Sequence, residues 1–294
     1  MKQNTLILSA FCMIFVLGSC KSKSKKVEEV KHEQEALIDT LDNSNGYFMQ
    51  TKFEQGMSAG KVTEFKFSPH LYSDTNATVE LQLLHEKKMH VIIVKNDLSL
   101  FYHIHPTQSV SGEYSVPFNF NYGGDYIVFV DYAPVNANQQ LERKEITVAG
   151  KGFDKKEYAI QQLTSKIEDF EVKLIPESKS LESGHAISFR STISLNGKII
   201  DANLLDNYLG AKAHMVIVSS DTKQFLHVHP MVMDKSLMLH TEFTVPGMYR
   251  GWLQFQYQGK LVVADFVFLV SEGSGHDHGS HDGHNKKEKV EHTH

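Results

Sequence analysis

The alternation of apolar and polar residues predicts β-strands along most of the chain. Val62–Phe67 and Ala77–Leu83 change from apolar to polar at every second residue, the period of a strand with one buried face. Tyr126–Tyr132 and Gly251–Tyr257 are rich in aromatic and β-branched residues, which also favour strands. Short strands at this spacing predict antiparallel β-sandwiches of immunoglobulin-like size.

The same pattern of residues occurs twice, 124 residues apart. Residues 90–106 and 214–230 are identical at eight of 17 positions, including three histidines, one aspartate, one phenylalanine and the closing proline. Repetition over this length indicates two copies of one fold. Downstream, further residues align after deletion of one position: Phe120, Gly124, Tyr126 and Phe129 with Phe243, Gly247, Tyr249 and Trp252.

The repeat therefore predicts an all-β protein with two tandem immunoglobulin-like antiparallel β-sandwich domains. We expect the first domain over residues 47–150 and the second over 167–272. The connector 151–166 carries apolar residues, Tyr158 and Leu163 among them, at a spacing that favours a short helix.

The first 19 residues are typical of an export signal. Lys2 precedes Leu6–Leu17, an apolar run that is too short to span a membrane. The run ends in Leu17-Gly-Ser-Cys20, which resembles the lipobox of bacterial lipoproteins. That resemblance implies cleavage before Cys20 and lipidation of its thiol. The alternative is an ordinary signal peptide that happens to contain a cysteine.

Residues 20–46 are charged and poor in aromatic residues, so we expect a disordered tether between a lipid anchor and the folded domains. Lys21 follows Cys20 directly, and the lack of an acidic residue there favours the outer membrane over the inner one. Cys12 would leave with the signal, so no disulfide and no thiolate metal site is expected in the mature chain.

Composition narrows the range of functions. The net charge is −5, and the basic residues form no cluster outside the tether, which argues against a nucleic-acid partner. The chain contains no Gly-x-Ser-x-Gly, no phosphate-binding Walker loop, no His-Glu-x-x-His and no dinucleotide fingerprint. We therefore predict that the protein is not an enzyme.

The repeated histidines are the strongest chemical signal. His103 and His105 are two apart on one predicted strand, so their side chains share a face. A four-residue loop centred between Asp97 and Leu98 would place His90 directly across from His105. Cross-strand Cβ atoms lie about 5 Å apart, which lets imidazoles converge on one metal ion about 2.0–2.1 Å from each nitrogen.

The same arithmetic applies to the second copy. We call His90, His103 and His105 the first triad, and His214, His227 and His229 the second triad. Two separate metal sites are predicted, one in each domain. The alternatives are structural imidazoles that hydrogen-bond the neighbouring loops, or a ligand of another kind. Three nitrogens with one open position suit zinc or copper, and the general affinity order favours copper.

Other donors near the triads differ between the copies. Possible additional ligands are His85 before the first triad, and Met231, Met233 and His240 after the second. Thioethers are soft ligands that suit Cu(I), although packing is an equal explanation for the methionines. Residues 273–294 form a histidine-rich tail that we expect to be disordered and able to bind metal through His276, His278, His281 and His284.

These motifs resemble a known family. The segments His85–Val94 and His103-Ile-His-Pro106, followed by Gly-Gly-x-Tyr, are similar to the YtkA-like, immunoglobulin-like domains of bacterial envelope proteins, and Phe225–Pro230 resembles the C-terminal module of the same family. The resemblance covers most of residues 60–270. It implies an envelope protein connected with heavy-metal efflux or copper-handling proteins, but no reaction and no particular metal. The histidine-rich tail departs from the family's pattern.

The combined expectation is a lipid-anchored envelope protein that binds copper or zinc as a buffer, chaperone or efflux accessory. The alternative from a different class is a non-catalytic adhesion or scaffold protein whose histidines are structural. Ligating imidazoles must be neutral, so we expect metal release below about pH 6.

Overall fold

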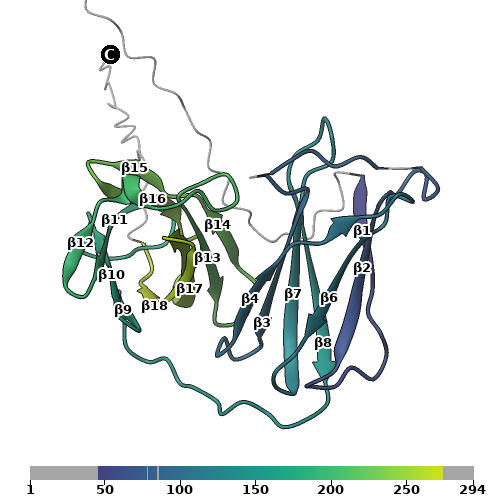
Figure 1. The fold of residues 1–294 in the computed structure, drawn as a ribbon, viewed down its shortest axis with the longest axis horizontal. Coiled ribbons are helices and arrows are strands. Elements are labelled where there is room, and N and C mark those ends of the chain that lie inside the picture. Colours follow the sequence, from purple (N-terminus) through teal and green to yellow (C-terminus); the bar gives the residue numbers. More distant parts are fainter. Residues whose placement is uncertain (1–45, 78, 85, 274–294) are drawn as a thin grey trace, which may run out of the picture. The chain divides into compact units, whose positions relative to one another are not determined.

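The computed structural model describes residues 46–273 except Thr78 and His85 (Figure 1). The predicted signal peptide, Cys20, nearly all of the tether, and the histidines of the tail lie outside the described residues. Among the described residues, no helix has the length and apolar character needed to cross a membrane.

The first domain contains two four-stranded sheets, in the orders β1-β2-β6-β5 and β4-β3-β7-β8. All their pairings are antiparallel. The described strands of this domain are β1 (Tyr47–Lys52), β2 (Val62–Leu71), β3 (Met89–Lys95), β4 (Phe101–Ile104), β5 (Thr107–Gln108), β6 (Tyr114–Asn119), β7 (Gly124–Tyr132) and β8 (Gln140–Val148).

The second domain repeats this plan with additions. One sheet has the order β14-β13-β17-β18, and the other has the order β15-β16-β11-β10-β9 with β12 paired to β11. The described elements are β9 (Thr164–Ile167), β10 (Phe170–Pro176), β11 (Ala186–Leu195), β12 (Lys198–Ile200), the 3-10 helix η2 (Ala202–Leu204), β13 (Ala213–Ser219), β14 (Phe225–Val228), β15 (Met231–Met233), β16 (Ser236–Glu242), β17 (Gly247–Tyr257) and β18 (Lys260–Val270).

Each domain has its own apolar core between its two sheets. In β2, buried and exposed positions alternate, and Phe65 and Phe67 are fully buried. They pack with Val91 and Ile93 of β3 in the core of the first domain. In the second domain, Met215 of β13 occupies the corresponding core. The predicted tandem of all-β sandwiches is therefore confirmed.

Two local predictions were wrong. The described part of Ala77–Leu83 is not a strand, although Leu81 forms an isolated bridge to Pro134 and is buried. The connector is not helical either. Gln162 bridges Val267 of β18 through two backbone hydrogen bonds of 2.9 Å, and Ile160 is 80% exposed. Pairing to an available strand edge outweighs a weak helical periodicity.

A third apolar cluster joins the two domains. The strands β3 and β13 are buried along their whole length, because one face packs into their own sandwich and the other packs against the opposite domain. The cluster is formed by Ile92, Val94, Leu98, Ile127, Phe129, Val216, Val218, Phe225 and Trp252.

Equivalent residues meet across this interface in a reciprocal way. Phe101 of the first copy stacks on Trp252 of the second at 4.7 Å between ring centroids. Phe129 and Phe225, which occupy the matching positions, pack at 4.8 Å. Residue i thus contacts j′ while j contacts i′, as in an isologous contact between two like subunits.

Candidate metal centre

The first histidine hairpin has the predicted register. Val91 pairs with Ile104, so the next step along the ladder brings His90 opposite His105. The backbone N–H of Lys95 donates to the carbonyl of Leu100 at 3.1 Å and closes a loop over residues 96–99. The predicted loop, centred between Asp97 and Leu98, is therefore confirmed.

The second hairpin has the same geometry. Met215 pairs with Val228, which places His214 opposite His229 at the next step. The backbone N–H of Ser219 donates to the carbonyl of Gln224 at 3.0 Å. The matching loop positions of the two copies, Leu98 and Thr222, both adopt positive φ, at 57° and 58°.

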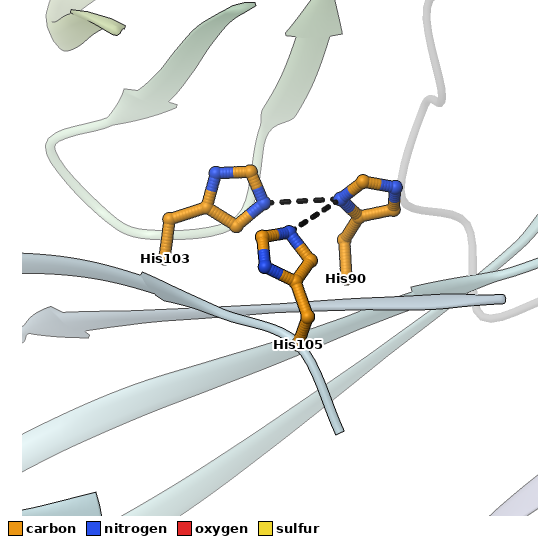
Figure 2. Close-up of side chains that lie close together, drawn as sticks. All are labelled: His90, His103 and His105. Atoms are coloured by element: carbon orange, nitrogen blue, oxygen red, sulfur yellow. Dashed lines mark hydrogen bonds between the residues drawn. The ribbon is translucent and has the colours of Figure 1, made fainter. Parts of the chain in front are cut away.

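The nitrogen atoms of the first triad converge on one another, as Figure 2 shows. His90 Nδ1 lies 3.1 Å from His103 Nε2 and 3.2 Å from His105 Nε2. One ligand atom from each ring lies within 4.8 Å of the others, and the second triad meets the same criterion. Two nitrogens bound tetrahedrally to one ion at 2.0–2.1 Å are about 3.3 Å apart, so the observed spacing fits a metal ion.

Hydrogen bonds on the outer side of the first triad determine which ring nitrogen carries the proton. His90 Nε2 lies 2.9 Å from the carbonyl oxygen of Leu84, which can only accept, so Nε2–H donates. His103 Nδ1 lies 2.6 Å from Gln254 Oε1 and donates in the same way. In the neutral rings, the lone pairs therefore sit on His90 Nδ1 and His103 Nε2, the two nitrogens that face each other.

The second triad is held in an equivalent way. His214 Nε2 donates to the carbonyl of Tyr208 at 2.9 Å. His227 Nδ1 donates to Asp131 Oδ2 at 2.9 Å. Leu84 and Tyr208 stand at matching positions, each pairing with the residue three places on in a tight turn, so the turn directs each carbonyl to its histidine.

The outer partners are exchanged between the domains. Asp131 of β7 lies opposite His90, and Gln254 of β17 lies opposite His214. Yet Asp131 accepts from His227 of the second triad, and Gln254 accepts from His103 of the first. Each domain therefore orients a histidine of the other. An outer carboxylate or carbonyl of this kind fixes the tautomer of a ligating histidine.

The rings of His103 and His105 favour the neutral form at neutral pH, because both pKa values are lowered. Burial lowers the pKa of His103 to about 4. Burial, with the neighbouring His103 and His90, lowers the pKa of His105 to about 2. With the outer protons placed as above, a metal cation between His90 Nδ1 and His103 Nε2, which lie 3.1 Å apart, would accept a lone pair from each ring. The donor set thus fits a cation that accepts imidazole.

Each triad lies in its own domain, as predicted, but the two triads are adjacent across the domain interface, which the sequence did not predict. The ring centroids of His90 and His227 are 5.3 Å apart, and those of His103 and His227 are 5.9 Å apart. Four of the histidines lie on β3, β4, β13 and β14, and His105 and His229 directly follow β4 and β14. The sequence pattern describes each hairpin but contains no information on how the domains dock.

The other predicted donors have different places. Met231 and Met233 lie on β15, in the sheet that does not carry the triad, and are 45% and 46% exposed. His240 lies on β16 of that same sheet, where its Nδ1 is 2.8 Å from the hydroxyl of Ser188. Met89, directly before His90 in the sequence, packs in the core of the first domain. The structure brings the two triads together, but places these donors elsewhere.

The sequence reasoning missed the outer partners, Asp131 and Gln254. Asp131 is fully buried and Gln254 is 3% exposed. A signal was present in the sequence, because each is a polar residue within a strand of apolar neighbours at matching positions of the repeat. Burial of such a group requires a partner, which here comes from the opposite domain.

Comparison with known families matches both copies of the repeat. A family described as a domain of unknown function (DUF8832) matches residues 42–150 and 165–272. The chain belongs to this family. The two matched ranges agree with the two sandwich domains, and the family's description assigns no ligand or activity. No curated protein matches the chain.

Similarity to solved structures is weak. The chain resembles trypsin-activated alpha-2-macroglobulin from Escherichia coli with a TM-score of 0.28 and 9% identity, over 78% of this chain and 17% of that one. A Corynebacterium diphtheriae protein described as membrane anchored gives a TM-score of 0.23 and 8% identity, over 78% of this chain and 59% of that one. The chain thus spans less than two thirds of either protein, and similarity at this level carries no argument about function.

Proposed function

We propose that this protein is a lipid-anchored envelope protein that binds a transition metal, copper in preference to zinc, as a non-catalytic buffer, chaperone or efflux accessory. The observation that carries the proposal is the convergence of three imidazole nitrogens in each triad, where outer hydrogen bonds hold two of the three rings with their other nitrogen toward the triad. Three neutral imidazoles with an open position suit Cu and Zn, and Cu binds such sites more tightly.

The envelope location rests on different support. The lipobox-like Leu17-Gly-Ser-Cys20 and the similarity to YtkA-like domains favour a lipid-anchored protein in the outer membrane, with metal efflux or copper-handling proteins as partners. An exposed copper ion would react with its surroundings. The triads, each with one buried and two partly buried histidines at a domain interface, are therefore suited to holding a metal ion without using it for chemistry.

A direct metal titration tests this proposal. All variants are made in one background chain, the full-length protein with Cys12→Ser and Cys20→Ser. In it, asparagine also replaces the six histidines of the tail, which are His276, His278, His281, His284, His292 and His294. These changes remove thiols and tail imidazoles that would bind metal independently. We expect the purified background chain to retain Cu(II) or Zn(II) through gel filtration, with the metal content measured by mass spectrometry.

Matched variants show whether the triads carry the binding. Replacing all six triad histidines by asparagine should abolish metal retention. His240→Asn, which removes a histidine from the other sheet of the second domain, should leave retention unchanged. A background chain that retains neither metal would refute the proposal.

A second candidate function is a scaffold whose histidines hold the domains together. The hydrogen bonds from His103 to Gln254 and from His227 to Asp131 favour it, because they cross the interface without any metal. In that case, triad variants would destabilise domain docking while metal content stayed at zero.

A further inference from the structure

His227 of the second triad lies as close to His90 and His103 of the first triad as imidazoles within one triad lie to each other. Within the triads, ring centroids are between 4.6 and 5.9 Å apart. Between the triads, His90 lies 5.3 Å from His227 and 6.5 Å from His214. The two triads therefore adjoin each other through His90 and His103 of the first and His214 and His227 of the second.

The geometry points to a single two-metal centre in the domain interface, in which each triad holds one ion beside the other. This inference rests on the proposed function, because it requires triads that bind metal. It goes further in the number of ions and in their proximity. The ligand class is a pair of imidazole-binding transition-metal cations.

The proximity of the ions follows from the ring positions. A metal ion about 2.0–2.1 Å from an imidazole nitrogen lies about 3 Å from the centre of that ring. Ions bound to His90 and His227, whose ring centres are 5.3 Å apart, are thus at most about 12 Å apart. Both ions would therefore lie in the domain interface, within this distance of each other.

The surroundings of the cluster favour a fixed pair of sites. In the same interface, the apolar cluster around Phe129, Phe225 and Trp252 excludes water from one side. His90, His214 and Asp131 are fully buried. The carboxylate of Asp131 adds a buried negative charge, which reduces the repulsion between two cations.

The exchanged hydrogen bonds tie both triads to one docked arrangement. A shift of the domains would break the bond from His227 to Asp131 and the bond from His103 to Gln254 together. The distance between the two ions is therefore set by the same contacts that orient their ligands.

Electron paramagnetic resonance of the Cu(II)-loaded background chain tests the inference. The probe is Cu(II), added at one and at two equivalents. We expect two ions per chain, with a spectrum at two equivalents that is broadened by spin–spin interaction and carries a half-field transition. Dilution of the loaded protein should leave this interaction unchanged, because both ions belong to one chain.

Variants of single triads provide the matched controls. Asparagine at His90, His103 and His105 leaves the second triad, and asparagine at His214, His227 and His229 leaves the first. Each variant should bind one Cu(II) with an unbroadened spectrum, and this retained binding shows that the domain carrying the remaining triad is folded. Should a variant fail to fold, His105→Asn and His229→Asn change one histidine of each triad.

The outcomes separate this inference from the proposed function. Two ions whose spectrum is the sum of the two single-triad spectra would overturn the two-metal centre but leave metal binding intact. Fewer than two Cu(II) ions per chain would also overturn it. A background chain that binds neither Cu(II) nor Zn(II) would refute the proposed function itself.

Discussion

The two copies of the repeat contribute equivalent faces to one interface, but they contribute different chemistry. The first copy supplies Asp131, a buried carboxylate that faces the second triad. The second copy supplies Gln254, a neutral amide that faces the first triad. An outer carboxylate raises the basicity of a ligating imidazole more than an amide does. The unequal partners, more than the nearby methionines, are what distinguish the two triads.

The largest expected effect is a loss of stability when a side chain of the domain interface is removed. Phe225 is fully buried in the apolar cluster, whereas its counterpart Phe101 is only partly buried. We expect Phe225→Ala to lower the free energy of unfolding by about 3–5 kcal/mol, and Phe101→Ala to lower it by less. Chemical denaturation of the metal-free protein, followed by circular dichroism, measures both.

The single tryptophan offers a check on that comparison. Trp252 is the only tryptophan of the chain and stacks on Phe101 in the interface. Its fluorescence should change in Phe101→Ala before any loss of secondary structure. Equal destabilisation by the two alanine substitutions would show that the copies do not differ in their packing.

The next largest effect is on the Cu(II) affinity of the second triad, and it tests how the two triads differ. Asp131→Asn keeps the shape of the side chain but removes its charge, so we expect the Cu(II) affinity of the second triad to fall about 10–100-fold. Competition with a chromophoric chelator measures this affinity in a background chain whose first triad is disabled by His105→Asn.

The reciprocal substitution is the matched control. Gln254→Glu gives the first triad the kind of partner that the second triad has, and we expect its affinity to rise toward that of the second. If Asp131→Asn leaves the second triad unchanged, the outer carboxylate does not tune the site.

The smallest effect concerns pH in the metal-free protein. The pKa of His103 is lowered to about 4 in the folded chain, below the value of about 6.5 in the unfolded chain. The unfolded state therefore binds more protons, and stability is lost as pH falls from about 6.5 toward 4, by at most about 1.4 kcal/mol per pH unit for this group. Thermal melts across this range should show the loss.

A variant isolates the contribution of this residue. His103→Gln removes the group that titrates, so its melting temperature should depend less steeply on pH than that of the wild type. A slope that is unchanged in the variant would assign the pH dependence to other groups.

The sequence allowed the hairpins to be predicted in detail, because register depends on local loop length. The pairing of His90 opposite His105 followed from the position of Asp97 and Leu98 alone. Docking of the domains was not predictable in the same way, since it depends on contacts between residues more than 90 positions apart, such as Asp131 and His227. One clue was present: the run Val91–Val94 does not alternate, as expected of a strand covered on both faces.

The reciprocal interface has a consequence for how such a protein can diversify. Two separate identical chains could meet through the same faces, but both would then present the same residue at the position of Asp131 and Gln254. A symmetric pair of this kind can have two carboxylates or two amides, never one of each. Joining the copies in one polypeptide removes that restriction, so each half of the molecule is free to set the chemistry of the other.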